Sequence, residues 1–292
     1  MQWEWKSEPD PSWPIGVFDS GLGGLTVWRA LRRRLPHERL IYFGDTARLP
    51  YGERSPEEIL AFVRQILTWM QAQPVKLVVM ACNTSSALAL EQVRQEFALP
   101  VLGLILPGAQ AALAQGSRIG VLATVATVKS RAYSRAIQEY SALDPKRFPY
   151  PVYCWEQACP EFVPLIEAGW LDSPALRQAA ERYLQPLLQQ GIDTLVYGCT
   201  HYPLLDPILK PLLPSSVKRV DPGMALVGSL ARELSLWDLR RPLTAAWGEP
   251  HRFYVSGDPE RFAQLATPWL GFRPQVERVE LPALDVSNSL RP

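Results

Sequence analysis

The sequence predicts an α/β protein of two pseudo-symmetric domains, each built on a doubly wound parallel sheet, with a site in the cleft between them. Apolar runs of strand length alternate with amphipathic helical segments, an order typical of parallel sheets covered by helices on both faces. The second half of the chain repeats the pattern of the first. A length of 292 residues, 47% of them hydrophobic, is sufficient for two medium-sized domains with their own cores.

The first half begins with residues 1–14, which are rich in proline, tryptophan and charge and which we interpret as an N-terminal extension. After it we expect two strands that end in polar turns, at 14–24 and 38–52, and then a helix at 55–73. A strand at 76–82, a helix at 83–97 and a strand at 99–106 follow. The helix at 55–73 carries a start signal, because Ser55 can cap it, proline suits its first position and Glu58 completes a capping box.

The second half follows the same plan, with a strand, a helix and a strand at 118–128, 173–191 and 193–205. The Ser-Pro helix start at Ser173 lies 26 residues before Cys199, and the corresponding start at Ser55 lies 27 residues before Cys82. We interpret this as an internal duplication of an α/β unit, because its period is too long for a solenoid. Pro186 is expected to kink or divide the helix that contains it.

The tail of the chain predicts one more helix at 223–236 and a strand at 251–259, and we expect it to return to the first half. The first domain is then discontinuous. The predicted division begins with an extension at 1–14. The first domain, on the Cys82 side, comprises 15–105 plus 222–292, and the second domain, on the Cys199 side, comprises 106–221.

Composition excludes several classes of function. A net charge of +1 and a pI of about 7.7 give no electrostatic reason to expect binding to nucleic acid or an anionic membrane. The N-terminus lacks the pattern of a signal peptide, and no apolar run reaches the roughly 18 residues of a spanning helix. We therefore expect a cytoplasmic protein whose four cysteines stay reduced and do not form a disulfide framework.

Two of the cysteines occupy equivalent places in the two halves. Cys82 and Cys199 each end an apolar strand and precede polar residues that open a helix. Ligands bind at this edge of open α/β sheets, and a helix start is expected to lower the pKa of a thiol. Two thiols that face each other across a cleft could move a proton from one face of a carbon to the other. Cys154 and Cys159 lie in a segment that does not repeat, and we interpret them as buried structural thiols.

Two other uses of these cysteines and the nearby His201 stay open at this point. Cys82, Cys199 and His201 could bind zinc, although the chain has no CxxC pair and no obvious fourth ligand. Cys82 with His201 and Asn83 could form the centre of a Cys-His hydrolase, which would leave Cys199 without a role. We expect no metal and no cofactor.

Further polar residues stand at turns near the two thiols. Asp19 and Asp45 each end a predicted strand, where a turn role and a functional role are both reasonable. Glu167 precedes a turn, and taken alone it would be a solvated glutamate at a helix end; where a resemblance to a family calls for a glutamate here, we prefer it to Glu161 because of that placement and its spacing to Cys199. The glycines of "DSGLGG" miss the GxGxxG spacing, so we do not predict a dinucleotide site. They fit a backbone that must approach a small ligand closely.

At this level of detail the motifs are recognisable. The set "GVFDSGLGGLTV", "YFGDTARLPYG", "VMACNTSSA", "GVLATVATVKS", "CPEFVPLIEAG" and "GCTHYPLL", followed by "VDPG", closely resembles the glutamate racemases of the aspartate/glutamate racemase superfamily. The matches fall in order from residue 15 to about 205. The resemblance implies a cofactor-independent isomerase that supplies D-glutamate for peptidoglycan, and so for cell-wall synthesis and cell shape.

The resemblance also implies roles for individual residues. Cys82 would act as the base on D-glutamate and Cys199 as the base on L-glutamate, assisted by Asp19 and His201 respectively. Asp45 and Glu167 are the further acidic residues that the family carries. The implied substrate contacts are Asp19, Ser20, Tyr51, Gly52, Asn83, Thr84, Thr124, Thr127, Thr200 and His201. The implied assembly is a homodimer, without nucleic acid or membrane partners.

Three rival functions stay open beside this one. The first is a racemase of the same superfamily that acts on aspartate or hydantoins, although "GCTHYP" favours glutamate. The second is a non-catalytic protein that binds acidic amino acids, which leaves the paired thiols unexplained. The third is a pyridoxal-phosphate racemase, for which Lys129 is the suggestive lysine.

Overall fold

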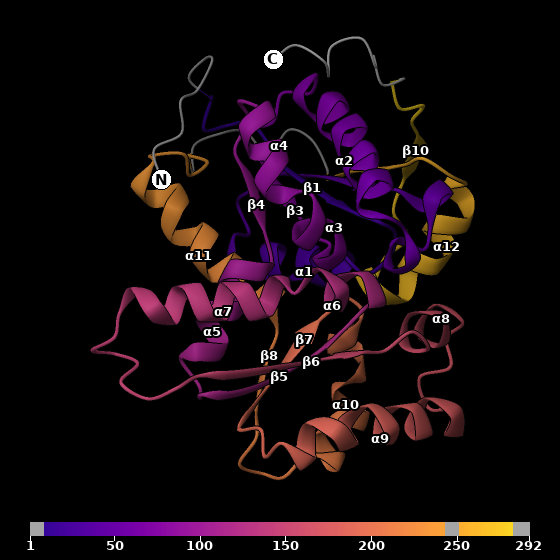
Figure 1. Ribbon diagram of the computed structural model, residues 1–292. Helices are drawn as coiled ribbons and strands as arrows, with labels where there is room; N and C mark the ends of the chain where they lie inside the picture. The colour runs from indigo at the N-terminus through magenta and orange to yellow at the C-terminus, as the bar shows by residue number, and fades with distance from the viewer. Residues whose placement is uncertain (1–8, 243–250, 283–292) are drawn as a thin grey trace.

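The computed structural model describes residues 9–242 and 251–282, and the strands of this part form two parallel sheets (Figure 1). The first sheet has six strands in the order β10-β9-β2-β1-β3-β4, and every neighbouring pair is parallel. Its strands are β1 (Ile15–Asp19), β2 (Leu40–Gly44), β3 (Leu77–Met80), β4 (Val101–Gly103), β9 (Arg252–Val255) and β10 (Val276–Arg278). The C-terminal strands β9 and β10 thus extend the sheet that the N-terminal half begins.

The second sheet repeats the topology of the first. Its four parallel strands have the order β6-β5-β7-β8, which matches the order β2-β1-β3-β4. They are β5 (Arg118–Ala123), β6 (Tyr153–Ala158), β7 (Thr194–Gly198) and β8 (Lys218–Val220). The predicted fold class, two parallel-sheet α/β units, is confirmed. The matching orders place β3, before Cys82, and β7, before Cys199, in equivalent positions.

Both faces of each sheet are buried, as a doubly wound fold requires. In β3, Leu77 and Val79 pack into one core, whereas Val78 and Met80 pack into the core on the opposite face. Two further cores cover the two faces of the second sheet. This explains why the strands read as nearly continuous apolar runs in the sequence and not as an alternation of polar and apolar residues.

Helices and short 3-10 turns connect the strands. The helices are α1 (Leu25–Arg34), α2 (Pro56–Gln71), α3 (Asn83–Leu88), α4 (Leu90–Glu96), α5 (Ile105–Leu113), α6 (Val125–Ser130), α7 (Ala132–Leu143), α8 (Phe162–Glu167), α9 (Pro174–Gln189), α10 (Asp206–Leu212), α11 (Pro222–Leu236) and α12 (Pro259–Leu270). The 3-10 turns are η1 (Thr46–Arg48), η2 (Tyr51–Glu53) and η3 (Tyr202–Leu205). The predicted capping box of α2 is present, since Ser55 Oγ accepts from Glu58 N at 3.2 Å and Glu58 Oε2 accepts from Ser55 N at 3.0 Å.

Several predicted elements differ from the structure. The strands expected at 118–128 and 193–205 end at Ala123 and Gly198, and they are followed by α6 and by the turn η3. The helix expected at 83–97 is divided at Ala89, because Ser86 ties α3 to the ends of β3 and β4 and the chain must turn before α4 can bury its own apolar side. The strand expected at 99–106 ends at Gly103, and α5 begins at Ile105. The helix around Pro186 is not divided, because Pro186 is exposed and water can solvate the carbonyl that it leaves unpaired.

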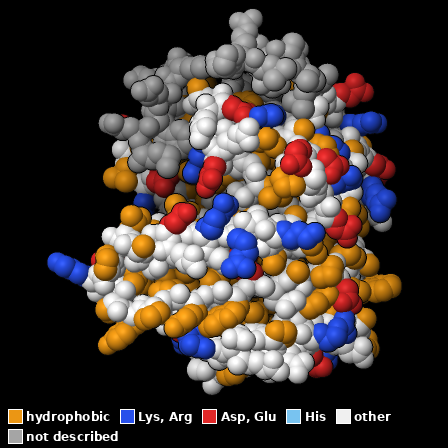
Figure 2. Space-filling view, viewed as in Figure 1, with side chains coloured by type: hydrophobic (Ala, Val, Ile, Leu, Met, Phe, Trp, Pro, Cys, Tyr) orange, Lys and Arg blue, Asp and Glu red, His pale blue; other side chains and the backbone are white. Residues whose placement is uncertain are grey.

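A buried ion pair joins Lys76, directly before β3, to Glu38, before β2, and Lys76 also binds the segments before β1 and after α11. Lys76 Nζ donates to Glu38 Oε2 at 2.6 Å, to the Pro11 carbonyl at 2.9 Å and to the Leu239 carbonyl at 2.8 Å. The predicted domain boundaries stay a prediction, and parts of them, 1–8, 243–250 and 283–292, lie outside the described residues. No helix in the described part is long and apolar enough to cross a bilayer. On the face shown in Figure 2, acidic and basic side chains of the described residues are interspersed.

Candidate active site

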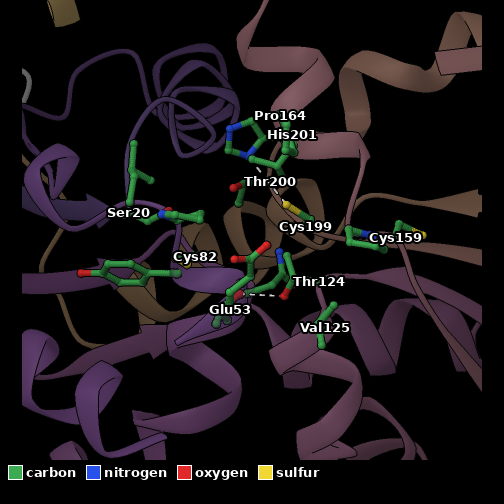
Figure 3. A pocket seen from close by; sticks show the side chains of 18 residues that line it. Ser20, Glu53, Cys82, Thr124, Val125, Cys159, Pro164, Cys199, Thr200 and His201 are labelled. Atoms are coloured by element: carbon green, nitrogen blue, oxygen red, sulfur yellow. Dashed lines mark hydrogen bonds between the residues drawn. The ribbon is translucent and has the colours of Figure 1, made fainter. Parts of the chain in front are cut away.

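One cavity brings the two cysteines together at the carboxyl ends of the two sheets (Figure 3). Its volume of about 60 Å³ is several times the roughly 10–15 Å³ that one water needs, so it has room for a small molecule. Ten of the residues predicted for the site line it: Ser20, Tyr51, Gly52, Cys82, Asn83, Thr84, Thr124, Cys199, Thr200 and His201. The other four predicted residues, Asp19, Asp45, Thr127 and Glu167, lie behind this wall and contact it.

The first thiol, Cys82, lies between β3 and α3 and is 5% exposed. Burial and then the carboxylate of Asp19 raise the pKa of Cys82 to about 12, against the lowering effect of hydrogen bonds from Ser85. The expectation that a helix start lowers the pKa of this thiol is therefore wrong. The helix α3 has only six residues, so desolvation outweighs the attraction of its N-terminus. Cys82 is a neutral thiol when the cavity holds no ligand.

The second thiol, Cys199, begins a chain of three side chains. Its Sγ lies 3.7 Å from His201 Nδ1, and His201 Nε2 lies 3.1 Å from Glu167 Oε1. Burial lowers the pKa of His201, but its hydrogen bonds to Cys199 and Glu167 and the charges of both outweigh burial and raise that pKa to about 10. A cation therefore stands beside Cys199 at neutral pH. Glu161, the carboxylate that we preferred less, instead pairs with Arg182 at the surface.

Asp19 supports the site from the end of β1, where it is fully buried. Its Oδ1 accepts from Gly21 N at 2.8 Å, and its Oδ2 accepts from Thr200 Oγ1 at 3.3 Å. Burial raises the pKa of Asp19, while the positive charge of His201 and the hydrogen bonds act against burial. Asp19 thus links the first sheet to the loop that carries the second cysteine.

The glycine-rich turn after β1 approaches side chains of the site itself. A Cβ on Gly23 would overlap both Thr200 Oγ1 and the His201 ring, and a Cβ on Gly24 would overlap Asp19. We expected these glycines to make room for a ligand. The structure shows that they make room for the residues around Cys199 to pack against the first sheet.

Asp45 is fully buried and holds a loop in place. Its Oδ2 accepts from Arg48 Nε at 2.6 Å and from the Tyr51 hydroxyl, and its Oδ1 accepts from Ser256 Oγ at 2.7 Å. Ser256 Oγ also accepts from Ala47 N at 3.0 Å. Both carboxylate oxygens are therefore used to fix the segment that carries Tyr51 to the cavity wall and to join it to the C-terminal part of the chain.

Uncharged hydrogen-bonding groups line much of the remaining wall. Tyr133 donates to Asn83 Oδ1 at 2.6 Å, which leaves the amide nitrogen of Asn83 for a ligand. Thr84 Oγ1 lies 2.9 Å from Thr124 Oγ1 and 3.3 Å from Thr127 Oγ1. This group joins α3, which follows Cys82, to the start of α6 in the other half. Hydroxyl and N–H donors at helix starts suit the carboxylates of an acidic ligand.

Sequence reasoning missed eight residues that line the cavity: Leu49, Pro50, Glu53, Val125, Cys159, Pro160, Val163 and Pro164. Seven of them lie within the quoted motifs and Glu53 directly follows one, so their position beside predicted contacts was the available signal. Cys159, interpreted as a structural thiol, reaches the wall, but its Sγ contacts the Gln157 carbonyl at 3.4 Å. Burial raises the pKa of Cys159 well above its usual value.

The structure also bears on the alternatives. In the described part of the chain, no group of three or more His, Cys, Asp and Glu side chains is arranged to hold a metal ion. His201 contacts Cys199 and not Cys82, and Asn83 contacts Tyr133, so the postulated hydrolase centre is not assembled. Lys129 is exposed in α6 and does not line the cavity, which leaves a pyridoxal-phosphate enzyme without its lysine there.

Comparison with known proteins gives one consistent result. The Asp/Glu/Hydantoin racemase family matches residues 25–230. A glutamate racemase of Picosynechococcus is 56% identical over 94% of this chain and 95% of its own length. The structure of a Bacillus anthracis glutamate racemase superposes with a TM-score of 0.85 at 35% identity, covering 93% of this chain and 99% of the other.

The Francisella tularensis glutamate racemase, whose structure contains D-glutamate, superposes with a TM-score of 0.82 at 34% identity, covering 94% of this chain and 99% of the other. The relatives and the solved structures therefore agree in sequence, in fold and in nearly full length. The resemblance found in the motifs is confirmed. The chain belongs to the Asp/Glu/Hydantoin racemase family, and within that family to the glutamate racemases.

Proposed function

We propose that this protein interconverts L-glutamate and D-glutamate without a cofactor, by proton transfer at the α-carbon between Cys82 and Cys199. The observation that carries the proposal is that both thiols line one cavity from equivalent places in the two sheets. The glutamate specificity rests on the sequence relatives. The product would supply D-glutamate for peptidoglycan.

The reaction needs one sulfur as a base and the other as an acid. With L-glutamate bound, the Cys199 thiolate takes the α-proton, and the Cys82 thiol gives its proton to the opposite face of the carbon. Cys82 then carries the negative charge and Cys199 the proton, and the reverse reaction exchanges their roles. Protons must return through the solvent or neighbouring groups before the next turnover in the same direction.

The charges around the two thiols support this assignment. The imidazolium of His201, 3.7 Å from Cys199 Sγ, stabilises the negative charge that this sulfur carries as a base. The raised pKa of Cys82 keeps its proton available for delivery. Asp19 places a negative charge near Cys82, in contrast to the positive charge of His201 near Cys199, and this negative charge favours the protonated form of the Cys82 thiol.

The carboxylates of the substrate bind the uncharged hydrogen-bond donors of the cavity wall. Ser20, Asn83, Thr84, Thr124 and Thr200 offer hydroxyl and amide groups around the cavity, with Tyr51 and Gly52 at its edge. Thr127 acts through its contacts to Thr84 and Thr124. Such fixed donors also stabilise the negative charge that develops on the α-carboxylate during proton removal.

The test uses purified protein in heavy water without added cofactor, with L-glutamate, D-glutamate and L-aspartate in separate reactions. Inversion of glutamate with deuterium entering at the α-carbon supports the proposal. Activity on aspartate alone would assign a different substrate to the same mechanism. Binding of glutamate without α-proton exchange would indicate a binding protein and refute the proposal.

The two thiols are tested by Cys82→Ala and Cys199→Ala. Because the enantiomers have equal free energy, kcat/KM is the same in both directions, and each variant must lose both directions together. We expect a loss of at least about 10³-fold, since positioned acids and bases contribute roughly 10²–10⁴-fold each. Normal racemisation by either variant would contradict the two-base assignment. The homodimer stays part of the proposal, and light scattering of the purified protein measures it.

A further inference from the structure

One charged side chain of the cavity wall has no role in the proposed chemistry. Among the described residues that line the cavity, Glu53 is the one carboxylate, and no lysine or arginine lines it. Glu53 is exposed, so it stands at the opening and not in the interior. In the view of Figure 3 its side chain is drawn between Cys82 and Thr124, among the residues that line the cavity. A substrate that enters passes this carboxylate.

No neighbouring cation neutralises Glu53. Within the described part of the chain it forms no hydrogen bond and no ion pair. The adjacent Arg54 is directed elsewhere, since its NH1 lies 3.2 Å from Glu58 Oε1 and its NH2 lies 3.5 Å from the Arg48 carbonyl. The negative charge of Glu53 therefore acts on the opening of the cavity, screened only by water and salt.

The backbone beneath Glu53 is held in place. Tyr51 is buried and its hydroxyl is bound by Asp45. A Cβ on Gly52 would lie 3.0 Å from Thr124 Cβ, so this glycine packs closely against the start of α6. The turn η2 is thus fixed on both sides, to the first sheet through Tyr51 and to the second half through Thr124. The backbone of Glu53 therefore stays at the cavity wall, and its side chain is the part that can move.

We infer that Glu53 is an electrostatic gate that opposes the entry of acidic amino acids and sets the affinity of the site for its substrate. This inference rests on the proposed function. Glutamate carries two carboxylates and one ammonium group, so its net charge is negative and Glu53 repels it during approach. Glu53 touches none of the reacting groups, so its charge weakens binding of substrate and product without a direct effect on proton transfer. It thereby favours release of product.

The decisive comparison is Glu53→Gln with the matched control Glu57→Gln. Both variants remove one exposed negative charge from the same segment, but Glu57 lies in the first turn of α2 and does not line the cavity. For unit charges roughly 8 Å apart, Coulomb's law corresponds to a factor on binding between about 2 at the dielectric constant of water and about 30 at the effective value near a protein surface. At about 10 mM ionic strength we expect Glu53→Gln to lower KM and raise kcat/KM for glutamate by a factor in this range, and Glu57→Gln to change neither.

Salt dependence separates charge from structure. At about 1 M salt, where screening acts within roughly 3 Å, the difference between Glu53→Gln and wild type should disappear. Glu53→Lys should lower KM further at low salt. Equal KM values for wild type, Glu53→Gln and Glu53→Lys at low salt would overturn the gate while leaving the racemase intact. A difference that persists at 1 M salt would also overturn it and indicate a steric effect. Absence of racemisation by wild type would refute the proposed function instead.

Discussion

Replacing Glu167 with glutamine should lower the pKa of His201 from about 10 to roughly 9. In the structure His201 is buried, and burial alone would lower its pKa; the bonds to Cys199 and Glu167 raise it instead. The His201 Nε2–Glu167 Oε1 distance is 3.1 Å, with 27% of the Glu167 side chain exposed. The glutamine oxygen still accepts the hydrogen bond, so the variant removes mainly the charge of the partner.

The magnitude follows from the net worth of a hydrogen bond to a charged group. Such a bond contributes about 1.5–3 kcal/mol, and one pKa unit corresponds to about 1.36 kcal/mol. Because the glutamine still forms a neutral hydrogen bond worth about 1 kcal/mol, the loss is about 0.5–2 kcal/mol and the expected shift is about 1 unit downward. Because the pKa of His201 lies above 7 in both proteins, His201 should be an imidazolium at neutral pH in both. The variant should lose this positive charge at a lower pH than wild type.

Nuclear magnetic resonance of protein labelled with ¹⁵N-histidine measures this shift directly. The chain contains three histidines, so three imidazole signals are expected, and His201→Asn identifies the relevant one. Burial lowers the pKa of His251 to about 4, so that ring stays neutral between pH 6 and 10.5 and does not interfere. Glu161→Gln is the matched control, because Glu161 pairs with Arg182 and does not contact His201.

The reasoning would be refuted if His201 titrated at the same pH in wild type and in Glu167→Gln, or if it titrated near 6.5 in wild type. An equal shift in Glu161→Gln would show that the effect is a general change in charge. If the assignment is correct, kcat/KM of Glu167→Gln should fall at alkaline pH, where the cation beside Cys199 is lost, and should approach the wild-type value near neutrality.

Three further changes test the packing of the site. Gly23→Ala should lower kcat at least about 10-fold with the fold retained in circular dichroism, because its Cβ would displace the Thr200 side chain; wild-type kcat would show that the turn can move at little cost. Asp45→Asn should lower the free energy of unfolding by about 2–4 kcal/mol in a urea titration, because it breaks a buried ion pair. It should also raise KM, because Asp45 holds Tyr51 at the cavity wall, and an unchanged KM would show that this loop does not affect substrate binding. Cys159→Ala should keep kcat within about 3-fold of wild type, because its thiol contacts a backbone carbonyl; loss of racemisation would add a third thiol to the mechanism.

The sequence by itself determined the repeated strands and helices around the pair of cysteines. Apolar runs and Ser-Pro helix starts are local signals, because capping and strand burial depend on residues close in the chain. The repeat of these signals placed Cys82 and Cys199 at equivalent strand ends, and the structure shows both on one cavity. The preference for Glu167 over Glu161 agrees with the contact of Glu167 with His201.

Only the tertiary structure decided how the site is charged and which residues face its ligand. The pKa of Cys82 is raised because the thiol is buried beside Asp19, which lies on another strand, and no pattern around Cys82 contains that information. Glu53 faces the cavity, whereas Asp45 stands behind it, although both belong to one loop. Local propensity determines where helices and strands begin, but desolvation and charge depend on the atoms that distant segments bring within a few ångströms.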